Sequence, residues 1–150
     1  MKYNNTFSKN QIHEIAHLVL THALAQETGA AVVIGLSGDL GAGKTTLTQS
    51  IARELGVTED VISPTYVIMK KYGIVAPAFN SRFTHLIHID AYRVESVSEM
   101  ITLGWERVIS EPSNLVIVEW PEKISSLIPP HTLSVSLSHH DQETRLIVVE

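Results

Sequence analysis

The sequence predicts an α/β fold, in which helices flank a mixed, mainly parallel β-sheet that ends in an antiparallel C-terminal hairpin. Short apolar runs alternate with helical segments along the chain, and this alternation is typical of parallel sheets. A glycine-rich loop over residues 38–45 lies between an apolar run and a helical segment. Residues 132–138 and 145–149 alternate between apolar and polar side chains around a polar turn, which predicts the hairpin. We expect a single domain over residues 1–150, because the chain is short for two domains and contains no linker-like stretch.

The first half of the chain is expected to form a helix, a strand and a second helix. Residues 8–11 have the pattern of a capping box, and apolar residues then recur at helical spacing, so a helix should begin here and end at residues 28–29. Residues 31–36 form an apolar run that is typical of a buried strand. Residues 46–55 favour a helix, and Gly56 suits its left-handed end.

The second half alternates in the same way before the hairpin. The expected elements are a strand over 66–72, a loop over 73–82, a strand over 84–89, a short helix from the capping box at 96–99 to Gly104, a strand over 115–118, and a short helical or irregular piece over 121–130.

The glycine-rich loop reads Gly-Asp-Leu-Gly-Ala-Gly-Lys-Thr and matches the phosphate-binding P-loop, G-x-x-x-x-G-K-[ST], at every constrained position. Glycines let the backbone curl so that successive N–H groups face a phosphate, and the start of the following helix adds a partial positive charge. Lys44 can reach the β- and γ-phosphates, and the Thr45 hydroxyl can bind Mg²⁺. The sequence therefore predicts a P-loop NTPase domain.

Two acidic residues stand where such a site needs them. Asp90 follows the apolar run 86–89, and Glu119 follows the apolar run 115–118. Ligands bind at the carboxyl ends of the strands in open α/β sheets. P-loop enzymes use an acidic group to hold Mg²⁺ and another group to orient the attacking water. We predict that Asp90 and Glu119 fill these roles, and the pattern leaves open which of them contacts the metal directly.

Thr65 is a further candidate, because it lies in a Ser-Pro-Thr turn between the P-loop helix and the next strand. Switch loops occupy this place in P-loop NTPases, and the hydroxyl could sense the γ-phosphate through Mg²⁺. The alternative is an ordinary proline turn. Arg93 and Arg107 have two interpretations as well, as groups that compensate charge in the transition state or as members of surface ion pairs.

The composition limits which partners the protein can bind and in which cellular compartment we expect it. The net charge is −5 and the isoelectric point is about 5.9, which argues against a strong grip on nucleic acid across the whole surface. The chain has no cysteine, so disulfides, thiolate metal sites and cysteine nucleophiles are excluded. The N-terminus lacks a signal-type apolar core, and the longest apolar stretch, over 29–36, is too short to span a bilayer. We expect a cytoplasmic protein without a membrane partner.

Sequence motifs exclude several classes of nucleotide-dependent protein. The Asn-Lys-x-Asp element of GTPases and the Ser-Gly-Gly-Gln signature of transporter ATPases do not occur, and the chain is too short for a helicase. A small-molecule kinase of the nucleoside or nucleotide type fits the size, although no arginine-rich lid is evident. A nucleotide-dependent binding module without useful turnover is the other alternative.

Four blocks together resemble the TsaE family, also called YjeE, of bacterial P-loop ATPases that act in tRNA threonylcarbamoyladenosine synthesis. These blocks are the P-loop with Thr46, Ser-Pro-Thr-Tyr at 63–66, His-Ile-Asp-Ala-Tyr-Arg at 88–93 and Glu-Trp-Pro-Glu at 119–122. The resemblance covers residues 6–129. It implies a weak ATPase that uses ATP and Mg²⁺ and acts with TsaB and TsaD, whose substrate is tRNA. The connection over 74–83 is longer than is usual in the family, and its length bears on how partners dock.

The resemblance also implies roles for individual residues. Thr45 and Glu119 would bind Mg²⁺, Asp90 would support the metal or the attacking water, and Thr65 would be the switch threonine. The phosphates would be held by Gly41, Ala42, Gly43, Lys44, Thr45 and Thr46. The family further implies that the N-terminal segment around Thr6, with Phe7 and Ser8, contributes to the nucleotide pocket and that Arg145 reaches the nucleotide from the C-terminal hairpin.

Overall fold

The computed structural model describes residues 2–75 and 82–150. In chain order its elements are β1 (Tyr3–Ser8), η1 (Lys9–Gln11), α1 (Ile12–Leu24), β2 (Val32–Ser37), α2 (Lys44–Leu55), β3 (Met69–Gly73), β4 (His85–Asp90), α3 (Val97–Thr102), α4 (Trp105–Ser110), β5 (Asn114–Glu119), η2 (Pro121–Leu127), β6 (Leu133–His139) and β7 (Thr144–Val149). The predicted loop over 73–82 falls partly on residues 76–81, which lie outside the described residues.

The described strands form one sheet in the order β1-β7-β6-β2-β5-β4-β3. The four central strands β6, β2, β5 and β4 run parallel, whereas β1, β7 and β3 add antiparallel edges. Strands β6 and β7 form the predicted C-terminal hairpin. The prediction of a mixed α/β sheet with a parallel centre is therefore confirmed.

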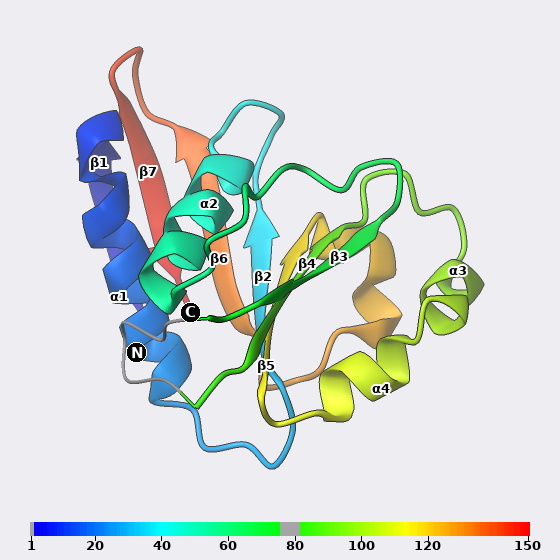
Figure 1. Ribbon diagram of the computed structural model, residues 1–150. Coiled ribbons are helices and arrows are strands. Elements are labelled where there is room, and N and C mark those ends of the chain that lie inside the picture. Colours follow the sequence, from blue (N-terminus) through cyan, green and yellow to red (C-terminus); the bar gives the residue numbers. More distant parts are fainter. Residues whose placement is uncertain (1, 76–81) are drawn as a thin grey trace.

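Helices cover both faces of this sheet, which gives three layers (Figure 1). Helices α1 and α2 pack together on one face, over a core that includes Leu20, Ile34, Leu47 and Ile117. The other face is covered by α3, α4 and η2, with Met100, Trp105 and Ile124 fully buried against the strands. The central strands are apolar on both faces because both faces are covered. The loop between β2 and α2 consequently opens at the carboxyl ends of the parallel strands.

Several boundaries differ from the sequence-based expectations. Helix α1 ends at Leu24 rather than at residues 28–29, and the Arg82 side chain donates to the backbone oxygens of Leu24 and Gln26 just beyond that end. The strand expected over 66–72 begins only at Met69, because Ile68 N–H donates to Pro64 O at 2.6 Å and closes a turn. Ile68 has a φ of 68°, which is rare for a β-branched residue.

Two further elements were not expected. Strand β1 runs through Tyr3–Ser8, where two consecutive asparagines interrupt the sequence pattern of a strand but pairing with β7 supplies the hydrogen bonds. Helix α4 follows Gly104, whose φ of 87° separates it from α3. Gly104 thus ends one helix as predicted and also begins the next.

Candidate functional site

The P-loop backbone forms an open cradle between β2 and α2. Gly38, Gly41 and Gly43 all have positive φ, at 148°, 79° and 108°. A Cβ atom added to Gly41 or Gly43 would meet nothing within 4 Å, so the space beside them is free for a ligand. Helix α2 then begins at Lys44 and directs its N-terminal N–H groups at the same space. The loop has the backbone needed to bind phosphate.

Lys44 lies inside this cradle and is only 5% exposed. Its ammonium donates to the backbone oxygens of Gly38 and of Asp39, the latter at 3.0 Å. It also lies 4.2 Å from the centroid of the Trp120 ring. Burial lowers the pKa of Lys44, because the charged form loses water, while the charges of Glu119 and Asp90 oppose this shift. The carbonyl oxygens carry only partial negative charge. A phosphate bound in the cradle would neutralise the Lys44 ammonium more fully.

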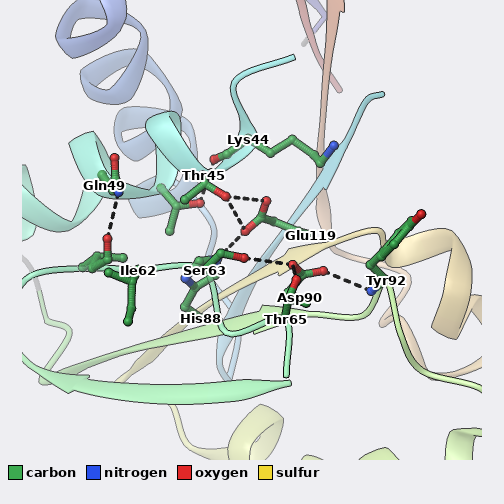
Figure 2. Close-up of polar contacts among 12 residues, drawn as sticks. Lys44, Thr45, Gln49, Ile62, Ser63, Thr65, His88, Asp90, Tyr92 and Glu119 are labelled. Atoms are coloured by element: carbon green, nitrogen blue, oxygen red, sulfur yellow. Dashed lines mark hydrogen bonds and ion pairs between the residues drawn. The ribbon is translucent and has the colours of Figure 1, made fainter. Parts of the chain in front are cut away.

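Glu119 lies at the end of β5, next to the P-loop helix. Parallel pairing sets Glu119 opposite Leu36 of β2 and opposite Asp90 of β4. The Thr45 hydroxyl donates to Glu119 Oε1 at 3.1 Å, and the His88 ring nitrogen Nε2 lies 2.5 Å from Glu119 Oε2. Figure 2 shows Glu119 between Thr45 and His88. The carboxylate is 3% exposed, so these contacts replace most of its hydration.

Asp90 lies beside Glu119 and holds the loop that precedes β3. Its Oδ2 accepts hydrogen bonds from Ser63 Oγ at 3.1 Å and from Thr65 Oγ1 at 2.5 Å, and its Oδ1 accepts the Tyr92 N–H at 3.0 Å (Figure 2). The structure thus brings Thr65 to the acidic pair, across a sequence separation of 25 residues from Asp90.

These groups line one pocket of about 270 Å³. Its walls are Leu40, Gly41, Gly43, Lys44, Thr45, Thr46, Ser63, Thr65, Asp90, Glu119 and Trp120. Ala42 of the predicted phosphate-binding stretch is buried, at 1% exposed, and lines a neighbouring pocket instead. The pocket combines backbone donors, one cation and two carboxylates, which is the chemistry of a metal-nucleotide site.

Comparison with known proteins identifies the family. The model of the family described as "Threonylcarbamoyl adenosine biosynthesis protein TsaE" matches residues 8–147. The chain belongs to the TsaE family. It is 35% identical over 128 residues to the tRNA threonylcarbamoyladenosine biosynthesis protein TsaE of Rickettsia felis, which covers 85% of this chain and 70% of that protein. The protein of the same name from Bacillus subtilis is 36% identical over 131 residues, with 85% and 77% covered. The fold is similar to the crystal structure of Bacillus subtilis YdiB, with a TM-score of 0.69, 27% identity and coverage of 99% of this chain and 84% of that one.

A second pocket of about 310 Å³ lies on the other side of the P-loop of this TsaE family member. Phe7, Lys9, Ile12 and Arg145 line it together with Gly41, Ala42, Gly43 and Thr46. The structure therefore brings Arg145 to the P-loop, and its contact with the nucleotide stays a prediction. Thr6 is not among the lining residues; it is exposed on β1, and the next residue, Phe7, is the one turned toward the pocket.

Sequence reasoning gave several residues of the site no specific role. Trp120, with a φ of 59°, lines the first pocket and packs against Tyr92, with the ring centroids 5.0 Å apart. A positive φ is uncommon for a bulky residue, and the sequence gives no sign that Trp120 adopts one. Ser63 and His88 were part of the quoted motifs without an assigned role. Lys9 and Ile12 lie beyond the N-terminal segment that the resemblance indicated, and only the fold places them beside the P-loop.

The remaining candidates lie outside the two pockets. Arg93 lies over the Tyr66 ring, with 4.6 Å between its guanidinium carbon and the ring centroid. Arg107 is exposed on α4. Across residues 2–75 and 82–150, no helix has both the length and the apolar character needed to cross a bilayer.

Proposed function

We propose that this chain is an ATP-binding and ATP-hydrolysing component of the machinery that makes N6-threonylcarbamoyladenosine in tRNA. The observation that carries the proposal is the pocket in which the P-loop, Lys44 and the two strand-end carboxylates meet. Membership of the TsaE family supplies the pathway, because the relatives in Rickettsia felis and Bacillus subtilis are named for this biosynthesis. The single domain over residues 1–150 and a cytoplasmic location are part of the same proposal.

The two pockets suggest how ATP is divided between them. Gly41, Gly43 and Thr46 line both pockets, so the P-loop forms the ridge between them. The phosphates occupy the first pocket, where Lys44 and the helix N-terminus lie. The nucleoside occupies the second, where Phe7 and Ile12 offer apolar surface and Arg145 offers a donor. Thr6 supports this pocket only through the backbone of β1.

The oxygen donors of the first pocket fit Mg²⁺. Thr45 Oγ1 and the carboxylates of Glu119 and Asp90 supply only oxygen, and Mg²⁺ binds through one or two carboxylates plus substrate phosphates. No group of three or more His, Cys, Asp or Glu side chains in the described parts of the chain could hold a metal alone, which suits an ion that arrives with the nucleotide. When bound there, Mg²⁺ would neutralise charge on the phosphates.

The side chains of the site then act mainly by positioning and by charge. Lys44 exchanges the carbonyl oxygens of Gly38 and Asp39 for phosphate oxygens. Thr65, released from Asp90, closes over the γ-phosphate as a switch residue. Asp90 Oδ2, which would still accept from Ser63, then has one acceptor position with which to orient the attacking water. Such placement of reactants supplies most of the acceleration in phosphoryl transfer.

The partners follow from the pathway. TsaB and TsaD are the proposed protein partners, and tRNA is the substrate of the complex. The net charge of −5 argues against strong binding of tRNA by this chain alone.

The test is the release of phosphate from ATP and Mg²⁺, with and without purified TsaB–TsaD from the same source. We expect weak turnover that TsaB and TsaD increase, and its loss in Lys44→Ala with the fold retained by circular dichroism. Normal hydrolysis by Lys44→Ala would refute the site. Transfer of labelled γ-phosphate to a small metabolite, without stimulation, would identify a kinase instead. Tight ATP binding without hydrolysis even in the complex would identify a binding module.

A further inference from the structure

A buried histidine lies behind the Glu119 carboxylate, and none of the roles above uses it. His88, on β4, is 0% exposed, and its Nε2 lies 2.5 Å from Glu119 Oε2. Among the described residues, the other side chain that hydrogen-bonds to Glu119 is Thr45. A buried carboxylate is costly unless donors replace its lost water, so these two contacts determine where the carboxylate lies.

The sheet register explains why the histidine is in this place. Asp90 of β4 pairs with Glu119 of β5, and His88 precedes Asp90 by two residues, so its side chain is on the same face of β4. His88 is not among the residues that line the pocket, whereas Asp90, Thr45 and Glu119 are. In Figure 2, dashed lines join the Glu119 carboxylate both to Thr45 and to His88. Thr45 therefore contacts the carboxylate from the pocket side and His88 from the interior.

The contacts also indicate which ring nitrogen carries hydrogen. A carboxylate only accepts hydrogen bonds, so the short contact requires the hydrogen on His88 Nε2. Nδ1 is buried and has no hydrogen-bond partner in the described parts of the chain. A buried N–H without an acceptor would carry the full cost of desolvation. The neutral ring with hydrogen on Nε2 satisfies both conditions.

We propose that His88 is a positioning residue for the Mg²⁺-nucleotide site. Its Nε2–H holds Glu119 Oε2, and this leaves Oε1 directed at Thr45 and the pocket. The proposal rests on the proposed function, since it concerns binding of Mg²⁺ with a nucleotide. Groups that orient a metal ligand from outside the coordination shell are typically worth about 10- to 100-fold in metal affinity. We expect a loss of this size when the donor is removed.

The experiment measures the Mg²⁺ concentration that half-saturates binding of a fluorescent N-methylanthraniloyl ADP, with ADP binding in EDTA as the reference. His88→Gln and His88→Asn form the matched pair. The Gln amide can reach the place of Nε2, whereas the Asn amide is one methylene too short. His88→Leu removes the donor altogether. Asn114→Leu is the control, because Asn114 is also a buried polar residue with one unpaired atom but lies at the other end of β5, about 16 Å along the strand.

The proposal predicts that His88→Asn and His88→Leu raise the half-saturating Mg²⁺ concentration about 10- to 100-fold while binding in EDTA is unchanged. His88→Gln should stay within about threefold of the parent, since it restores the donor, as should Asn114→Leu. Equal Mg²⁺ dependence in the parent and in His88→Asn would overturn the proposal. Equal losses of apparent Mg²⁺ affinity in His88→Gln and His88→Asn would overturn it as well. If His88→Leu does not fold, the comparison of His88→Gln with His88→Asn still tests the proposal. If ADP binding by the parent protein does not depend on Mg²⁺, the proposed function is contradicted instead.

Discussion

Replacement of the first P-loop glycine should damage the fold much more than replacement of the second. An added Cβ at Gly38 would approach the backbone oxygen of Leu137 in β6 closer than the 3.0 Å that real Cβ contacts observe, and it would lie 3.3 Å from Ala42 Cβ. The Leu137 oxygen belongs to the backbone of a strand and the Ala42 methyl has no rotamer to change, so neither neighbour can easily move aside. Gly41 has no atom within 4 Å of the same position, so its substitution meets only the cost of a positive φ.

The expected magnitudes follow from these two terms. A positive φ costs a non-glycine residue about 1–2 kcal/mol, and overpacking a well-packed site costs about 1–3 kcal/mol. Gly38→Ala should therefore lower the free energy of unfolding by about 2–5 kcal/mol, and Gly41→Ala by about 1–2 kcal/mol. With a urea dependence of about 2 kcal/mol per molar, the midpoints should fall by about 1–2.5 M and about 0.5–1 M.

Urea unfolding followed by tryptophan fluorescence and by far-UV circular dichroism measures both midpoints in the absence of nucleotide. A midpoint for Gly38→Ala equal to or above that of Gly41→Ala would refute the reasoning, because it would mean that the loop is not pressed against β6. Binding of ADP by Gly41→Ala provides a second readout. It should be weakened although the fold is nearly intact, since the new methyl group occupies the phosphate space.

Three further predictions concern Lys44, Thr65 and Trp105. Because burial lowers the pKa of Lys44, ADP affinity should fall as pH rises through this lowered pKa, whereas Lys44→Arg should show a flat profile by calorimetry between pH 7 and 10. The folded state releases this proton more readily than the unfolded state, so stability without nucleotide should rise over the same pH window. Thr65→Val should weaken binding of a non-hydrolysable ATP analogue more than binding of ADP, with recovery in Thr65→Ser; equal effects on both nucleotides would remove Thr65 from the switch role. Trp105→Ala, at a side chain that is 1% exposed, should cost about 3–5 kcal/mol in urea unfolding, and a cost below about 1 kcal/mol would contradict its place in the core.

The sequence was sufficient for those parts of the site that depend on local pattern. The P-loop, with its strand before and helix after, is encoded in consecutive residues, and each glycine has the positive φ that its motif position implies. Asp90 and Glu119 were found because each ends an apolar run, and the ends of parallel strands meet at one edge of the sheet. The C-terminal hairpin was evident for the same reason, since its alternation has a period of two.

The parts that the sequence did not reveal depend on contacts between distant segments. Strand β1 lacks a regular alternation of apolar and polar residues, and β7 supplies the hydrogen bonds that complete it, so periodicity does not indicate it. The place of Lys9 and Ile12 in the lining of the second pocket depends on the fold and could not be deduced from the sequence. The contact of His88 with Glu119 joins residues 31 apart and requires the β4–β5 register. In each case tertiary pairing, and not local preference, decides the position of the side chain.

In the structure, the groups proposed to bind ATP and Mg²⁺ already have internal partners. Lys44 donates to the loop's own carbonyl oxygens, Thr45 to Glu119, and Thr65 to Asp90. Binding must therefore exchange hydrogen bonds rather than add them, and an exchange contributes only a small net free energy per bond. The gain has to come from charge, because a phosphate meets a desolvated ammonium whose present partners are neutral oxygens and an aromatic ring. Thr65 has no such gain until a γ-phosphate is present, so we expect its bond to Asp90 to persist with ADP and to be broken selectively with ATP.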